Sequence, residues 1–119
     1  MNWYLAKIVF RIICGEGDHT PQFDEQLRLI AAGNEDEAFY KAQSLGVQEE
    51  DVFMNVEKKS VQWKFINVSE LYRISALIDG AELYSRITEA DDAKEYINLV
   101  HKKAKGIQEK EIHKMLQLL

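Results

Sequence analysis

The chain has 119 residues, a formal net charge of −5 and a single cysteine, Cys14. This length supports one domain with one hydrophobic core, and a lone cysteine excludes an intrachain disulfide. Residues 1–100 hold 10 Lys and Arg against 18 Asp and Glu, and this acidic balance argues against a nucleic-acid partner, whose backbone is bound by clustered basic side chains.

Two strands joined in a hairpin are predicted at the start of the chain. From Trp3 to Cys14 every even position is apolar, which indicates a strand with one face in the core. Residues 15–21 contain two glycines and the only proline, so we expect a loop there. Alternation returns over residues 23–32, where one strand face is formed by Phe23, Glu25, Leu27, Leu29 and Ala31. Cys14 lies on the apolar register and is interpreted as a structural thiol.

A short helix is predicted next. Gly33 interrupts the strand pattern, and Asn34 with Glu37 has the spacing of an N-terminal cap. Helical spacing then follows at Ala38, Phe39, Ala42 and Leu45. Gly46 predicts the C-terminal stop, because glycine adopts the left-handed conformation that ends many helices.

The middle of the chain is predicted to form further strands. Residues 52–56 fit either an irregular strand or an extra helical turn. Residues 60–74 read as one long strand whose alternation changes phase near Asn67 to Ser69, which indicates a bulge. Asp79 and Gly80 form a strong turn signal, and residues 81–87 are expected to return as a strand.

Helices are predicted for the C-terminal part. Thr88 is the expected cap of a helix whose apolar stripe runs from Ala93 to Ala104, and Gly106 is expected to interrupt it. A final short helix follows. Residues 101–119 hold five Lys against two Glu, which we interpret as a solvated helix face.

Together these elements predict an α+β fold, an antiparallel β-sheet with helices packed on one face in the order β-β-α-β-β-α-α. We expect one domain over residues 1–119.

No spacing in the sequence forces a reaction. The three histidines are far apart, and no Cys-x-x-Cys pair, nucleophile elbow or phosphate-binding glycine loop is present, so we assign no catalytic residue, metal site or cofactor and expect a protein without enzymatic activity. Polar and aromatic strand residues form either a cross-strand charge ladder, which we favour, or a small anion-binding groove. The candidate binding residues are Lys7, Arg11, Trp63, Tyr84 and Arg86.

Four segments resemble the bacterial family catalogued as domain of unknown function 4288 (DUF4288). They are Trp3-Tyr4-x-Ala6-Lys7, the run from Leu29 to Ala38, Trp63-Lys64-Phe65 and Tyr84-Ser85-Arg86. The resemblance covers roughly residues 2–88 and implies a bacterial, cytoplasmic α+β protein with no established activity. Residues 89–119 are then a C-terminal helical extension. The absence of a signal peptide or a long apolar run also predicts a cytoplasmic protein with no membrane partner.

The leading functional hypothesis is a non-enzymatic protein-interaction module that forms a homodimer through a sheet edge or the C-terminal helices. Two alternatives stay open: a small-molecule or anion-binding protein that uses the polar sheet face, and an acidic immunity or inhibitor protein that masks a basic partner. Aromatic and aliphatic side chains that lie outside the predicted core are the candidate interface residues: Trp3, Ile112, Met115, Leu116 and Leu119.

Overall fold

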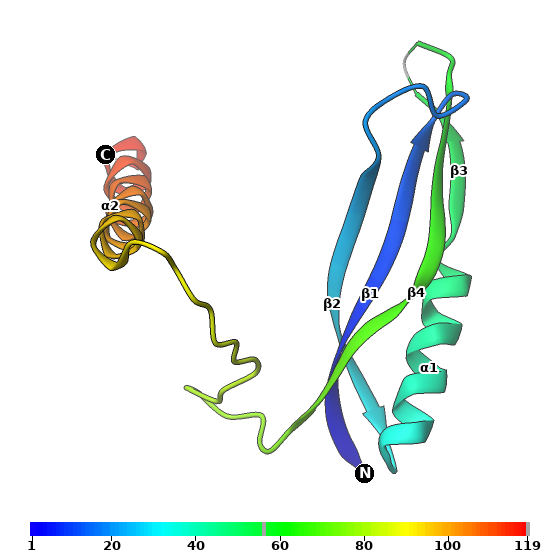
Figure 1. Ribbon diagram of the computed structural model, residues 1–119, viewed down its shortest axis with the longest axis horizontal. Helices are drawn as coiled ribbons and strands as arrows, with labels where there is room; N and C mark the ends of the chain where they lie inside the picture. The colour runs from blue at the N-terminus through cyan, green and yellow to red at the C-terminus, as the bar shows by residue number, and fades with distance from the viewer. Residues whose placement is uncertain (56, 119) are drawn as a thin grey trace. The chain divides into compact units, whose positions relative to one another are not determined.

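The first hairpin forms as the alternating pattern predicts. β1 spans Asn2–Cys14 and β2 spans Gln22–Ala32, and they pair antiparallel in one unbroken register from Asn2 opposite Ala32 to Ile12 opposite Gln22. The computed structural model, shown in Figure 1, describes residues 1–55 and 57–118. The chain divides into two compact units, Met1–Ser85 and Arg86–Leu119.

The first unit is a four-stranded antiparallel sheet in the order β2-β1-β4-β3, with β3 at Asp51–Met54 and β4 at Ser60–Ile74. The expected bulge in the long strand is confirmed, because the β1–β4 register shifts between Lys7 and Ile8 and again between Val9 and Phe10. Each shift leaves one extra residue in β4. The apolar residues on both sides of each shift therefore point to the core face of the sheet.

Helix α1 spans Glu35–Gln48 and covers one face of the sheet, beside the end of β1 that carries the N-terminus (Figure 1). Its predicted cap is confirmed: the Asn34 side chain accepts a hydrogen bond from the Glu37 N–H at 2.8 Å, and Glu37 Oε2 accepts from the Gly33 N–H at 3.0 Å. The core lies between α1 and the sheet, and its buried members are Tyr4, Ala6, Ile8, Phe10, Ile30, Ala32, Ala38 and Ala42.

The predicted helix stop at Gly46 is wrong. The helix continues to Gln48, and Gly46 is a buried helical residue that packs against the Phe65 ring. A β-carbon added at Gly46 would lie 2.4 Å from two atoms of that ring. Glycine is therefore needed here for close packing and not for a left-handed backbone.

The strand predicted over residues 81–87 is also wrong. The turn itself forms, since Gly80 has φ +82° and the Ala81 N–H donates to the Ile78 carbonyl at 3.0 Å. However, β4 ends at Ile74, which pairs with Trp3 near the beginning of β1. Residues 81–87 follow the turn as irregular backbone, and Tyr84 packs against Tyr72 of β4 through its ring and not through strand pairing. The ambiguous segment after α1 forms β3 instead.

The second unit contains α2, which spans Ala93–Gln117. Its cap is Asp92 and not Thr88, because the Asp92 side chain accepts from the Lys94 and Glu95 N–H groups. The two predicted C-terminal helices form one continuous helix that runs through Gly106.

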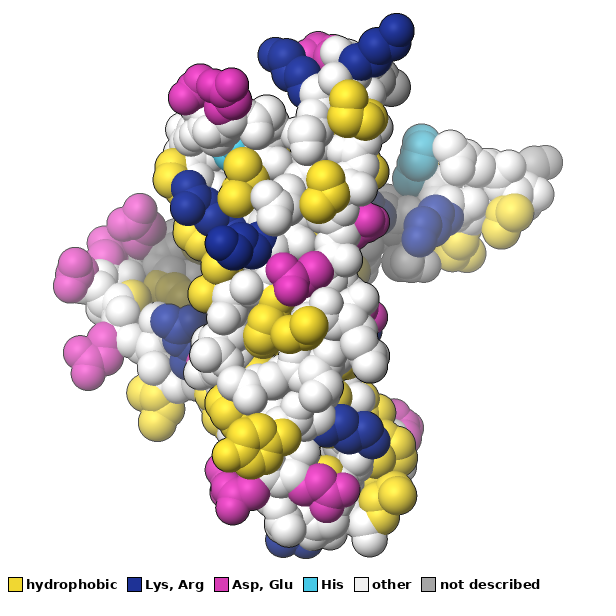
Figure 2. All heavy atoms as spheres, turned by 90° about the vertical axis from the view of Figure 1, so that its right-hand side faces the viewer, with side chains coloured by type: hydrophobic (Ala, Val, Ile, Leu, Met, Phe, Trp, Pro, Cys, Tyr) yellow, Lys and Arg dark blue, Asp and Glu magenta, His cyan; other side chains and the backbone are white. Residues whose placement is uncertain are grey.

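The α+β class and the antiparallel sheet are confirmed, with the predicted order of two strands, a helix, two strands and a helical C-terminal part. Figure 2 looks at the side of the first unit that carries α1 and β3, where apolar side chains are interspersed with charged ones.

Candidate functional site

The sheet face opposite α1, here called the open face, carries a compact polar cluster. Lys7 Nζ lies 2.7 Å from Glu70 Oε2, and the two residues are paired across β1 and β4. The Tyr72 hydroxyl donates to Glu70 Oε1 at 3.2 Å, and the Tyr84 ring packs edge-on against Tyr72 with centroids 5.5 Å apart. The fold thus brings together Lys7 and Tyr84, two of the predicted binding residues.

These contacts change the proton affinity of two groups. The hydrogen bond from Lys7 to the Glu70 carboxylate raises the pKa of Lys7 above its ordinary value of 10.5. Partial removal from water raises the pKa of Tyr72 above 10.0, and its hydrogen bond to Glu70 adds to the rise. Lys7 therefore stays charged at neutral pH, with its charge directed at Glu70. Lys7 and Glu70 thus form a cross-strand ion pair of the kind expected in a charge ladder.

Arg11 shares the open face with this cluster but lies four residues along β1, about 13 Å away. It is paired with Phe23 on β2 and with Lys64 on β4, which carries the same charge. Within the described part of the chain, Arg11 Nε is buried and has no hydrogen-bond partner.

Trp63 lies on the other face of the sheet, partly buried against the core cluster. Its Nε1 donates to Asp24 Oδ2 at 3.1 Å, and its ring stacks on Phe53 with centroids 5.7 Å apart. The same Asp24 oxygen accepts from Gln26 Nε2 at 2.6 Å. Sequence reasoning missed this Asp24 contact, because the apolar positions of the β2 pattern are Phe23, Leu27 and Leu29, whereas the structure places Asp24 on the core side.

The remaining candidates are divided between the two units. Arg86 belongs to the second unit. On α2, Ile112, Met115 and Leu116 are exposed by 53%, 66% and 62%, and Leu119 lies outside the described residues. In the first unit, Trp3 is 37% exposed on the open face.

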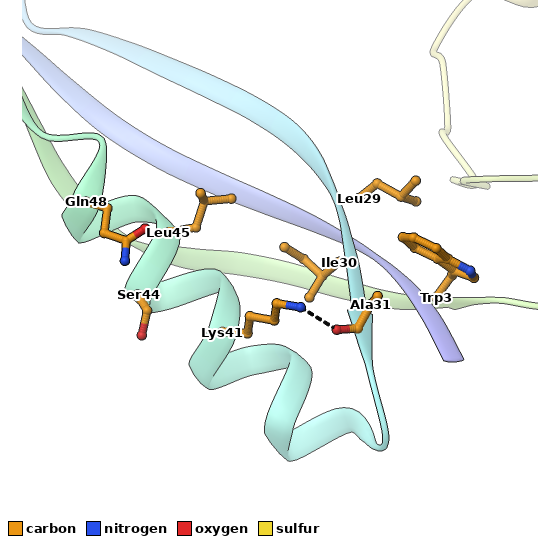
Figure 3. Close-up of a pocket in the computed structure, with 8 residues that line it drawn as sticks. All are labelled: Trp3, Leu29, Ile30, Ala31, Lys41, Ser44, Leu45 and Gln48. Atoms are coloured by element: carbon orange, nitrogen blue, oxygen red, sulfur yellow. Dashed lines mark hydrogen bonds between the residues drawn. The ribbon is translucent and has the colours of Figure 1, made fainter. Parts of the chain in front are cut away.

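A hollow of about 460 Å³ lies along the outer edge of β2. Figure 3 shows Lys41, Ser44, Leu45 and Gln48 of α1 on one side of the strand, with Leu29 and Trp3 on the other. Lys41 Nζ donates to the Ala31 carbonyl at 2.8 Å, drawn as a dashed line. Apart from Trp3, the sequence reasoning did not identify these residues. The only available signal was the position of β2 as a possible edge strand.

The hairpin loop holds His19, which accepts a hydrogen bond from the Cys14 N–H at Nε2 and contacts the Thr20 carbonyl through Nδ1, each at 2.9 Å. Both ring nitrogens are therefore occupied by the backbone. Across residues 1–55 and 57–118, no group of three or more His, Cys, Asp and Glu side chains is placed to hold a metal ion. Neither described helix is long and apolar enough to span a membrane.

The fold and these surfaces define a small α+β protein with an antiparallel sheet covered by α1 on one face and carrying a charged and aromatic cluster on the other. The model of the family described as "Domain of unknown function (DUF4288)" matches residues 3–85, and the chain belongs to this family. No curated protein and no solved structure matches the chain.

Proposed function

We propose that the protein is a non-enzymatic interaction module that forms a homodimer. The observation that carries this proposal is a strip of exposed apolar side chains on the open face at the β2 edge. Phe23, Leu27 and Leu29 lie on this face of β2 with exposures of 54%, 52% and 47%, with Glu25 between Phe23 and Leu27, and Trp3 is paired with Ala31 at the end of the same strip. Exposed apolar side chains gathered in this way are typical of binding sites.

The polar residues of the open face support interaction more than ligand chemistry. The Lys7 charge is directed at Glu70, and Trp63 is on the opposite face. The residues proposed for an anion groove are thus not assembled around one concave surface. Aromatic rings beside a neutralised ion pair suit a protein interface, where Trp and Tyr are enriched.

The proposal also includes a bacterial cytoplasmic location. The free thiol of Cys14, which is partly buried, supports it because the cytosol keeps thiols reduced.

The test is the molar mass of the full chain by sedimentation equilibrium over a range of concentrations. The expected result is a species of twice 13.8 kDa that dissociates on dilution. Leu29→Lys should weaken the dimer because it introduces an unpaired charge into the apolar strip. The matched control is Val47→Lys, on the exposed surface of α1 at 56% exposure, which should leave the mass unchanged. A mass of 13.8 kDa at every concentration would overturn the homodimer.

A further inference from the structure

Building on the proposed homodimer, we infer that its two copies join by antiparallel pairing of β2 with β2 of the second copy, centred on Gln26. The two four-stranded sheets then become one continuous sheet. The pairing surface is the outer edge of β2, at one end of the strand order β2-β1-β4-β3.

The opposite edge of the sheet is built to resist pairing. β3 has only four residues, and the part of β4 beyond it carries the two register shifts. The Glu50 carboxylate accepts from the Phe65 N–H at 3.3 Å, and the Asn67 side chain accepts from the Val68 N–H at 2.8 Å. Short strands, bulges and side chains that occupy backbone groups are the means by which proteins protect sheet edges.

Along its centre, the β2 edge is neither short nor bulged, in contrast to the opposite edge. The strand runs for 11 residues in an unbroken register, and its sequence contains no proline. Lys41 occupies the Ala31 carbonyl at one end of the strand (Figure 3). Because backbone groups alternate in direction along a strand, this contact indicates that Leu29, Leu27 and Glu25 also direct their N–H and C=O groups outward.

The side chains of β2 select one register for a two-fold pairing. Opposite residues of an antiparallel pair project from the same face, so the two-fold axis must pass through a residue position.

With the axis at Gln26, Asp24 lies opposite Arg28 of the second copy, and this pair occurs twice. Phe23 then lies opposite Leu29, both on the open face. An axis at Glu25 or Leu27 places Gln26 opposite Asp24 or Arg28 instead, and an axis at Asp24 or Arg28 places like charges together.

The side chains that form this register are already held by contacts within one copy. Arg28 Nε donates to Gln26 Oε1 at 3.1 Å, and its Nη2 forms an ion pair with Glu49 of α1. Gln26 in turn donates to Asp24, which Trp63 also anchors. This ladder aligns Arg28, Gln26 and Asp24 along the strand, and it reduces the side-chain entropy lost on pairing.

The test is site-directed disulfide formation in a Cys14→Ser background. Gln26 would sit on the two-fold axis in a non-hydrogen-bonded pair, where Cα atoms are about 4.5 Å apart, within the range that a disulfide spans. Gln26→Cys should therefore oxidise to a covalent dimer of twice 13.8 kDa on a non-reducing gel. The matched control is Gln22→Cys, on the same face of β2 but opposite Ile30 of the second copy, which should stay monomeric on that gel.

A second measurement does not depend on a cysteine variant. In amide hydrogen exchange, the Glu25, Leu27 and Leu29 amides should be protected at high protein concentration and lose that protection on dilution, whereas the Gln26 amide, bonded to β1, should not change. A dimer by sedimentation that shows neither crosslinking at Gln26 nor concentration-dependent protection overturns the β2 pairing and leaves the proposed homodimer standing. A monomer at all concentrations overturns both.

Discussion

Replacing Gly46 with alanine tests the packing of α1 on the sheet. Gly46 is buried inside the helix, and a methyl group there would lie 2.4 Å from Cδ1 and Cε1 of the Phe65 ring. Ordinary carbon contacts lie at about 3.5–4.0 Å, so the ring or the helix must move by about 1 Å. The Phe65 ring packs edge-on against the buried Phe10, with centroids 6.0 Å apart, and such a movement disturbs that contact.

Two opposing effects set the magnitude. Alanine in place of glycine favours a helix interior by about 1 kcal/mol. Overpacking of a well-packed core costs about 1–3 kcal/mol. Because the clash involves ring atoms held between the helix and Phe10, we expect overpacking to win and Gly46→Ala to lower the free energy of unfolding by about 1 kcal/mol.

The assay is urea unfolding followed by circular dichroism, arranged as a double-mutant cycle with Phe65→Ala. Without the ring, Gly46→Ala should become neutral or stabilising, because only the helix preference is left. Ser44→Ala is the matched control, since Ser44 is exposed on the same helix and its replacement should stabilise slightly. The packing argument is refuted if Gly46→Ala stabilises the otherwise unchanged protein as Ser44→Ala does.

Three further predictions concern other elements. Gly106→Ala should stabilise α2 by about 1 kcal/mol and raise the midpoint at which heating removes its circular dichroism signal, because a β-carbon there meets nothing within 4 Å; a lower midpoint would contradict the continuous helix. Asn34→Ala should lower the free energy of unfolding by about 1 kcal/mol in urea, because the Glu37 N–H loses its acceptor, and Asn34→Asp should restore it. The raised pKa of Lys7 means that its bond to Glu70 stabilises the fold fully at neutral pH and that this contribution is lost as pH rises beyond 10.5. Unfolding measured from pH 8 to 11 should therefore show a shallower alkaline loss in Glu70→Gln, and equal slopes would refute this role.

Local sequence patterns predicted the fold correctly where each pattern is typical of a single structural element. The alternation in β1 and β2, the Asn34 cap and the phase change in β4 all depend on neighbouring residues, and all are confirmed. Gly46 was misread because glycine marks both helix ends and close contacts, and only the position of Phe65 distinguishes them. The strand predicted over residues 81–87 is absent because a turn signal predicts that the chain reverses direction. It does not predict that the segment after the turn pairs with a strand.

The candidate site was less predictable because it depends on register. Lys7 and Tyr84 could be placed on strand faces from alternation, but the bulges in β4 decide that Glu70 is opposite Lys7. Trp63 lies on the opposite face from Lys7, and its bond to Asp24 joins two strands that are not adjacent in the sheet. Such contacts follow from the whole sheet order and not from any one segment.

The central position of β1 has a consequence for the order of folding. β1, β2 and α1 are consecutive in the chain, so they can assemble through short loop closures. Pairing of β1 with β4 joins residues 71 positions apart at its far end, Trp3 with Ile74, and must wait for a much larger closure. Trp63 is carried by this late strand while Trp3 belongs to the early one, so the two tryptophans report successive steps of refolding.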